Sequence, residues 1–238
     1  MIKIENVEVM GWEHVIRGMR NPMNSWDKSD SGICKGGDGG IGCKNCAGYD
    51  CEHTYDHSFQ LGKADHDLMM RLAAGGPVHA KYRRMIVVYL DITAPLYWWK
   101  EFDTYKVGTV ANSCSTMYKI AAKEFTLEDF SCEHLCGFSS PINGGNQYMN
   151  SLTPLGVTIE YLNAARNAFI ETKDKEYWWQ MIQLLPSSYN QRRTVMLNYE
   201  VLTGIYPMRK NHKLDEWREF CQWIEQLPYS EIIVGEQK

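Results

Sequence analysis

Eight cysteines and seven histidines offer the first chemistry that this chain could carry. Cys43 and Cys46 form a Cys-x-x-Cys pair inside a glycine-rich segment, with Cys34, Cys51, His53 and His57 close by. Zinc takes four nitrogen or sulfur ligands in a tetrahedron. If zinc binds here, the expected ligands are Cys34, Cys43, Cys46 and Cys51, with His53 as a substitute. Because Cys51-Glu-His53 breaks the usual spacing, a loop with incidental thiols and a redox pair stay open.

Arginines near the C-terminal end offer a second chemistry. Arg192, Arg193, Asn198 and Arg209 follow one another within eighteen residues. A guanidinium can bind phosphate through two parallel hydrogen bonds, so this set is a candidate phosphate clamp, and the solvated face of a helix is the alternative. A third group contains Lys100, Lys106, Ser113, Ser115 and Tyr118, and by itself it indicates only a polar connection.

Hydrophobic periodicity predicts the elements that must position these residues. We expect an opening strand over 2–9 and a buried strand over 85–92. Helices are expected over 12–20, 64–74, from Pro95 to near Gly108, from 152 onward, and over 174–185, 188–203 and 211–227. Thr126 with Asp129 is a helix-capping signal, and 143–145 are a loop. On a helix, Arg192 and Asn198 would face broadly the same side. Glycine-rich residues 29–60 are expected to be an insertion in a single domain spanning 1–238.

Composition excludes several classes of protein. Hydrophobic residues make up 44% of the 238 residues, so the chain can bury a core and wholesale disorder is excluded. A net charge of −4 argues against bulk affinity for nucleic acid or anionic membranes. No apolar run approaches the roughly 20 residues of a membrane span, and no signal-peptide core is present. We therefore expect a cytoplasmic α+β protein with reduced thiols.

Two blocks of sequence together resemble the flavin-dependent thymidylate synthases. In the first, Ala94-Pro95-Leu96 matches that family's strand end, and Ser115 and Tyr118 match its closing serine and tyrosine with one residue inserted. The family's Arg-His-Arg falls on Thr104-Tyr105-Lys106. In the second block, Leu185-Pro186, Arg192, Asn198 and Arg209 follow the family's spacing without gaps.

Several signature residues of that family are replaced. The family's turn glutamate falls on Ser113, and the arginine before its closing tyrosine falls on Met117. A flavin-contacting histidine that the family places before the strand falls near Met85, with His79 six residues upstream. Lys106 keeps the one positive charge at the Arg-His-Arg position.

The resemblance implies a fold, a reaction and a set of roles. It implies a small mixed sheet with a helical C-terminal half, and methylation of deoxyuridylate by a folate one-carbon donor and reduced flavin (FAD). Ser115 and Lys106 would be catalytic, while Arg192, Arg209, Asn198 and Ser113 would bind the pyrimidine nucleotide. His79, Thr104, Tyr105 and Lys106 would contact the flavin. The alternative is a non-catalytic nucleotide- or ligand-binding protein on the same scaffold.

The resemblance also implies a homo-oligomer, because that family builds its sites between subunits. Eight tryptophans in 238 residues point the same way, since aromatic residues are enriched in interface cores. We expect a tetramer.

Overall fold

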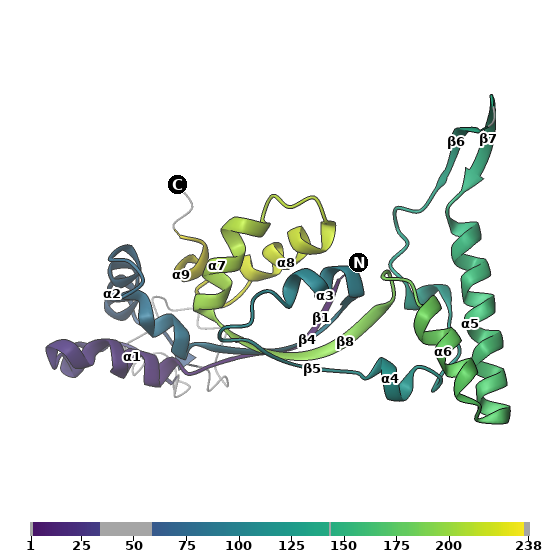
Figure 1. The fold of residues 1–238 in the computed structure, drawn as a ribbon. Helices are drawn as coiled ribbons and strands as arrows, with labels where there is room; N and C mark the ends of the chain where they lie inside the picture. Colours follow the sequence, from purple (N-terminus) through teal and green to yellow (C-terminus); the bar gives the residue numbers. More distant parts are fainter. Residues whose placement is uncertain (1, 34–58, 143, 236–238) are drawn as a thin grey trace, which may run out of the picture.

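Four strands form the central sheet of the computed structural model, which describes residues 2–33, 59–142 and 144–235 (Figure 1). The strand order is β1-β4-β8-β5, and every neighbouring pair is antiparallel. The strands span Lys3–Met10 (β1), Val87–Pro95 (β4), Asn190–Asn198 (β8) and Val110–Ser113 (β5). Because β4 and β8 are central and pair along their whole length, they fix the positions of the residues on both faces.

Helices cover one face of this sheet, and two further groups of elements lie at its ends (Figure 1). The covering helices are α3 (Leu96–Phe102), α7 (Tyr199–Arg209), α8 (Asp215–Glu225) and α9 (Glu231–Val234). At one end lie α1 (Trp12–Arg20), η1 (Asn21–Met23), η2 (Trp26–Lys28), α2 (Lys63–Ala74) and η3 (Ala80–Met85). At the other lie α4 (Thr116–Lys119), η4 (Leu127–Asp129), α5 (Leu152–Thr172), α6 (Lys175–Leu184) and the hairpin of β6 (Gly137–Ile142) with β7 (Gly145–Asn150).

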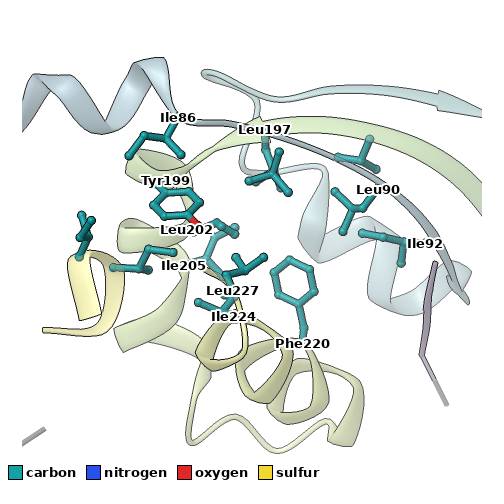
Figure 2. Packing of buried hydrophobic residues seen from close by; sticks show 14 of the residues in the cluster. Ile86, Leu90, Ile92, Leu197, Tyr199, Leu202, Ile205, Phe220, Ile224 and Leu227 are labelled. Carbon is teal, nitrogen blue, oxygen red and sulfur yellow. The ribbon is translucent and has the colours of Figure 1, made fainter. Parts of the chain in front are cut away.

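Strand alternation decides which face is covered. Val88, Leu90 and Ile92 of β4 and Val195 and Leu197 of β8 are buried against the helices, and Figure 2 shows several of these side chains meeting α7 and α8. Successive side chains of a strand point to opposite faces, so the residues between them lie on the other face. That second face carries the partly exposed Asp91 and the exposed Tyr89, Arg192 and Thr194.

Tryptophan side chains form the centre of the covered face. Trp98 is fully buried and packs against Trp99, Phe102, Trp217 and Phe220, with ring centroids 4.8–5.7 Å apart. A separate cluster under α5 and α6 contains Ile120, Phe125, Phe130, Leu155, Leu162 and Met181. Much of the aromatic surplus therefore serves this chain's own core.

A two-stranded ribbon joins the two ends of the expected insertion. β2 (Gly32–Ile33) pairs antiparallel with β3 (Phe59–Gln60), and the ring of Phe59 stacks on Trp12. Residues 34–58 lie outside the described residues. The predicted zinc ligands Cys34, Cys43, Cys46 and Cys51 fall within them.

The α+β class is confirmed, and three details are corrected. The predicted helix over 188–203 is wrong, because β8 and the start of α7 occupy that stretch. The sheet is antiparallel rather than mixed in the described part of the chain. The helix after Pro95 ends at Phe102 rather than near Gly108. The next residue, Asp103, pairs with Arg193 of β8.

Other elements agree with the sequence. The helix over 12–20 is confirmed as α1, and those over 64–74, 174–185 and 211–227 correspond to α2, α6 and α8. The opening strand and the buried strand correspond to β1 and β4, displaced by one to three residues. Thr126 and Asp129 form the capping box of η4.

Candidate functional site

A small hollow lies between the turn that follows β5 and the first residues of β8. Its volume is about 80 Å³. It is lined by Cys114, Ser115, Thr116, Lys119, Ile120, Tyr189, Asn190, Gln191 and Arg192. The structure therefore brings together two residues singled out from the sequence, Ser115 and Arg192. The hollow has room for a group of phosphate size, and a nucleoside would have to extend outside it.

Hydrogen bonds to β8 hold this turn in place. The Cys114 backbone N–H donates to the Arg192 carbonyl at 2.9 Å, and the Gln191 side-chain amide donates to the Cys114 carbonyl at 3.0 Å. The Ser115 hydroxyl caps α4 by accepting the Tyr118 N–H at 3.2 Å. Capping uses one acceptor site of the hydroxyl, so its O–H remains able to donate to a ligand.

Arg192 is held by carboxylates on the second face of the sheet. Its Nη2 lies 2.8 Å from Oδ2 of Asp91, and its Nη1 lies 3.4 Å from Oε2 of Glu5. Asp91 also accepts hydrogen bonds from Thr194 at 2.5 Å and Asn6 at 2.8 Å. The bonds from Thr194, Arg192 and Asn6 hold the pKa of the Asp91 carboxyl well below its usual range. This network holds the guanidinium over β4 and β1, whereas the hollow lies on the β5 side of β8.

Lys119 is the charged residue of this hollow that sequence reasoning missed. It is the last residue of α4, and it is exposed at the rim of the hollow. Lys119 and Arg192 are the two cationic residues that line the hollow. The spacing Ser115-x-x-x-Lys119, one turn of helix from a capping serine, was the available signal.

Asn198 does not lie beside Arg192. Both residues are in β8, on the same face by parity, but six residues of extended chain span roughly 20 Å. Asn198 instead caps α7, where its side-chain oxygen accepts the Val201 N–H at 3.1 Å. The predicted juxtaposition of Arg192 and Asn198 on one helix is therefore wrong, because the segment is a strand.

Arg209 lies in the helical layer on the covered face, away from Arg192 on the second face. Its Nη1 is 2.6 Å from Oε2 of Glu101, and its Nε donates to the Tyr105 hydroxyl at 2.8 Å. The guanidinium lies 4.4 Å from the ring centroid of Trp217, whose indole N–H also donates to Glu101. The side chain is 17% exposed. These contacts join the end of α7 to α3 and α8.

Lys106 and Ser113 lie at opposite ends of β5. Ser113 is exposed and pairs with Arg193, next to the hollow. Lys106 is exposed in the connection that leads into β5. Gly108 of the same connection lies against the Asn198 side chain at the other end of β8, since a Cβ added to Gly108 would lie 3.1 Å from that side chain. Within one chain, the two residues expected to be catalytic, Ser115 and Lys106, are therefore separated by the length of β5.

The residues expected to contact a flavin are divided between two regions. His79 is exposed and precedes η3. Thr104 donates its hydroxyl to the Glu101 carbonyl at the end of α3, and Tyr105 is bonded to Arg209. Two of these four side chains thus already have hydrogen-bond partners within the chain.

A larger groove of about 730 Å³ runs between α1 and the ends of β1 and β4. Its lining contains apolar and polar residues: Met10, Gly11, His14, Arg17, Gly18, Asn21, Met85 and Val87. Arg17 donates to Nδ1 of His14 at 2.9 Å, one helical turn away. Met85, the position near which the family's flavin-contacting histidine falls, lines this groove. Sequence reasoning missed His14 and Arg17, whose i, i+3 spacing on α1 was the signal.

No group of three or more metal-binding side chains gathers among the described residues. The four cysteines described, Cys114, Cys132, Cys136 and Cys221, are free thiols. Among the described residues there is also no helix both long and apolar enough to cross a lipid bilayer.

Comparison with solved structures shows the fold. Thymidylate synthase X from Helicobacter pylori, solved with FAD and dUMP, superposes with a TM-score of 0.60 at 12% identity, covering 99% of this chain and 98% of that one. A second structure of the flavin-dependent enzyme from Helicobacter pylori gives a TM-score of 0.58 at 13% identity, covering 98% and 100%.

A UMP/dUMP methylase, PolB from Streptomyces cacaoi bound with 5-bromo-UMP, gives a TM-score of 0.57 at 11% identity, covering 95% and 88%. No family model matches the chain, and no curated protein matches it in sequence. The chain thus has the fold of flavin-dependent thymidylate synthase, and it is similar in structure to proteins solved with FAD, dUMP or a UMP analogue.

Proposed function

We propose that this protein binds a pyrimidine nucleoside monophosphate, with its phosphate at the Ser115–Arg192 hollow, and methylates deoxyuridylate. The observation that carries the proposal is the convergence of Ser115, Lys119 and Arg192 on one phosphate-sized hollow in a fold shared with dUMP-binding structures. In this proposal Arg192 and Lys119 neutralise the phosphate, and the Ser115 hydroxyl donates to one of its oxygens. The guanidinium of Arg192 would exchange part of its contact with Asp91 and Glu5 for the phosphate.

The groove beside α1 has the chemistry that a flavin requires. Met10, Met85 and Val87 give it an apolar wall for a ring system, and Arg17 with His14 offers donors to a diphosphate. When bound, the flavin would supply the hydride and a folate would supply the carbon, since cofactors carry such chemistry. This chain's residues would bind and orient: Arg17 and His14 on the cofactor, Arg192 and Lys119 on the nucleotide.

The proposal includes assembly into a homo-oligomer, a tetramer by resemblance, in a cytoplasmic setting. Ser115 and Lys106 lie at opposite ends of β5, so both can serve one reaction only if a second subunit contributes to each site. Sedimentation at micromolar concentration should give the mass of an oligomer, four times the chain mass for a tetramer. A monomer would remove the shared site and the catalytic role of Lys106.

Arg192→Ala is expected to weaken deoxyuridylate binding by about 1.5–3 kcal/mol, the scale of a hydrogen bond to a charged group. Isothermal titration of deoxyuridylate into parent and variant measures the change. Asp91→Asn is the matched control, because it removes the carboxylate that holds Arg192 and leaves the guanidinium present. We expect this control to keep its affinity within a few-fold. A parent that binds no pyrimidine nucleotide would end the proposal.

Flavin binding has a test of its own. Purified protein, or protein incubated with FAD, should absorb near 450 nm, roughly, as oxidised flavins do, because a cofactor keeps its own spectrum. Arg17→Ala should lower the retained flavin while nucleotide binding stays. A protein that binds deoxyuridylate and cannot be loaded with flavin would favour the alternative, a nucleotide-binding protein without redox chemistry.

A further inference from the structure

The β6–β7 hairpin projects beyond α5, away from the central sheet (Figure 1). Its register runs without a break from Gly137 opposite Asn150 to Ile142 opposite Gly145. All six residues of β7 are exposed, with Tyr148 70% exposed. A two-stranded hairpin alone is at best marginally stable in water, so an arm of this length gains from a third strand.

This arm carries no charge. From Leu135 to Ile159 the sequence contains no aspartate, glutamate, lysine, arginine or histidine, although charged residues make up 23% of the chain. Exposed sheet edges are commonly protected from pairing by charged side chains, lysine above all. The hairpin lacks that protection, and an uncharged strand placed against a copy of itself meets no like charge.

The two outer edges of the hairpin differ. Pro141 is the penultimate residue of β6 and does not interrupt the register, so its nitrogen faces outward, the position in which a strand tolerates proline. Antiparallel pairs alternate in the direction of their backbone groups, so the residues that face outward with Pro141 are Gly137 and Ser139 on β6 and Asn146, Tyr148 and Asn150 on β7. The β6 edge therefore lacks the outward donor nearest the turn, and the β7 edge has its full set.

We propose that β7 pairs antiparallel with β7 of a second copy of this chain, around a twofold axis at Tyr148. Tyr148 would face its own equivalent, and Asn146 would face Asn150 of the other copy. The result is a four-stranded sheet in which every outward donor and acceptor of β7 finds a partner. A twofold contact of this kind requires a self-complementary surface, and the uncharged β7 edge is one. The inference does not depend on the proposed function.

Two pairs of matched variants test the proposal, because Ser139 is the cross-strand partner of Tyr148 and shares its outward direction. Tyr148→Cys should form a disulfide between chains under mild oxidation, since directly opposed antiparallel residues have the Cα separation that a disulfide requires. Ser139→Cys should give no more linked chain than the parent, whose own thiols set the baseline. Equal linking of the two variants would overturn the proposal.

Proline variants test the same edge without new thiols. Tyr148→Pro removes an outward donor from β7, and sedimentation should show that the species joined through the hairpin is halved in mass. Ser139→Pro removes an outward donor from β6 and should leave the mass unchanged. A monomeric parent, an unchanged mass in Tyr148→Pro, or dissociation in both variants would each contradict pairing through β7.

Discussion

Replacing Asp65 by alanine is expected to lower the free energy of unfolding by about 3–5 kcal/mol, the cost of leaving a buried partner charge uncompensated. Asp65 is fully buried on α2. Its carboxylate accepts a hydrogen bond from Nε of the buried Arg20 at 2.5 Å. It also accepts hydrogen bonds from the hydroxyls of Ser29 and Ser31 at 2.7 and 2.6 Å. Without the carboxylate, Arg20 has lost its counter-charge. Urea unfolding at neutral pH measures the loss.

Asp67→Ala is the control for this experiment, because Asp67 lies on the same helix and is exposed. Exposed substitutions of this kind usually change stability by less than about 0.5 kcal/mol. Equal losses in the two variants would show that the helix, rather than the buried ion pair, is what the substitutions disturb.

The same carboxylate predicts a dependence of stability on pH. Burial alone would raise the pKa of Asp65, but the hydrogen bonds from Ser31, Ser29 and Arg20 outweigh it and lower the pKa below its ordinary value. A lowered pKa in the folded state stabilises the protein above the unfolded-state pKa of about 3.9. That stabilisation is lost as the pH falls through the folded-state pKa. The stability gap between the parent and Asp65→Asn should therefore shrink on acidification.

Arg209→Ala is expected to destabilise the protein by about 2–3 kcal/mol, because it removes charge-assisted hydrogen bonds and a cation–π contact. The variant leaves Glu101 with the indole N–H of Trp217 and no close guanidinium. Lys100→Ala is the control, because Lys100 is exposed and lies next to Glu101 on α3. Urea unfolding of both variants measures the difference.

This expectation differs from the one that the sequence suggests for Arg209. As a phosphate ligand, Arg209 would lose nucleotide affinity on substitution while the fold stayed nearly intact. Its contacts with Glu101, Tyr105 and Trp217 favour a loss of stability instead. Titration of deoxyuridylate into the folded variant separates the two roles. A variant as stable as the parent that no longer binds nucleotide would restore the phosphate role.

Sequence periodicity located the elements whose pattern is decided by burial alone. α1 shows it as an amphipathic period, and β4 shows it as an apolar, β-branched run. β8 does not show such a pattern, because two of its inward positions are Gln191 and Arg193. Gln191 faces inward to hydrogen-bond the Cys114 carbonyl, and Arg193 stacks 4.1 Å from the ring of Trp99. Contacts between segments distant in the sequence hide the alternation of a strand.

The candidate site was partly accessible from the sequence for a related reason. The resemblance singled out Ser115 and Arg192, and the structure places both at one hollow. Neither the resemblance nor the spacing could show that Arg209 is engaged by Glu101, because Glu101 lies 108 positions away. His14 and Arg17 went unnoticed for the same reason, because their groove exists only once η3 brings Met85 against α1.

The short ribbon of β2 and β3 has a consequence for how this fold can vary. Ile33 and Phe59 face each other as cross-strand neighbours, so the two ends of the stretch 34–58 are held close together. The cost of closing a loop grows only slowly with its length. The rest of the molecule therefore sets no particular length for the stretch between these residues. A variant of this chain with a longer or shorter stretch between these positions is therefore expected to keep the same junction, held by the hydrogen bonds of Asp65 and the stacked ring of Phe59.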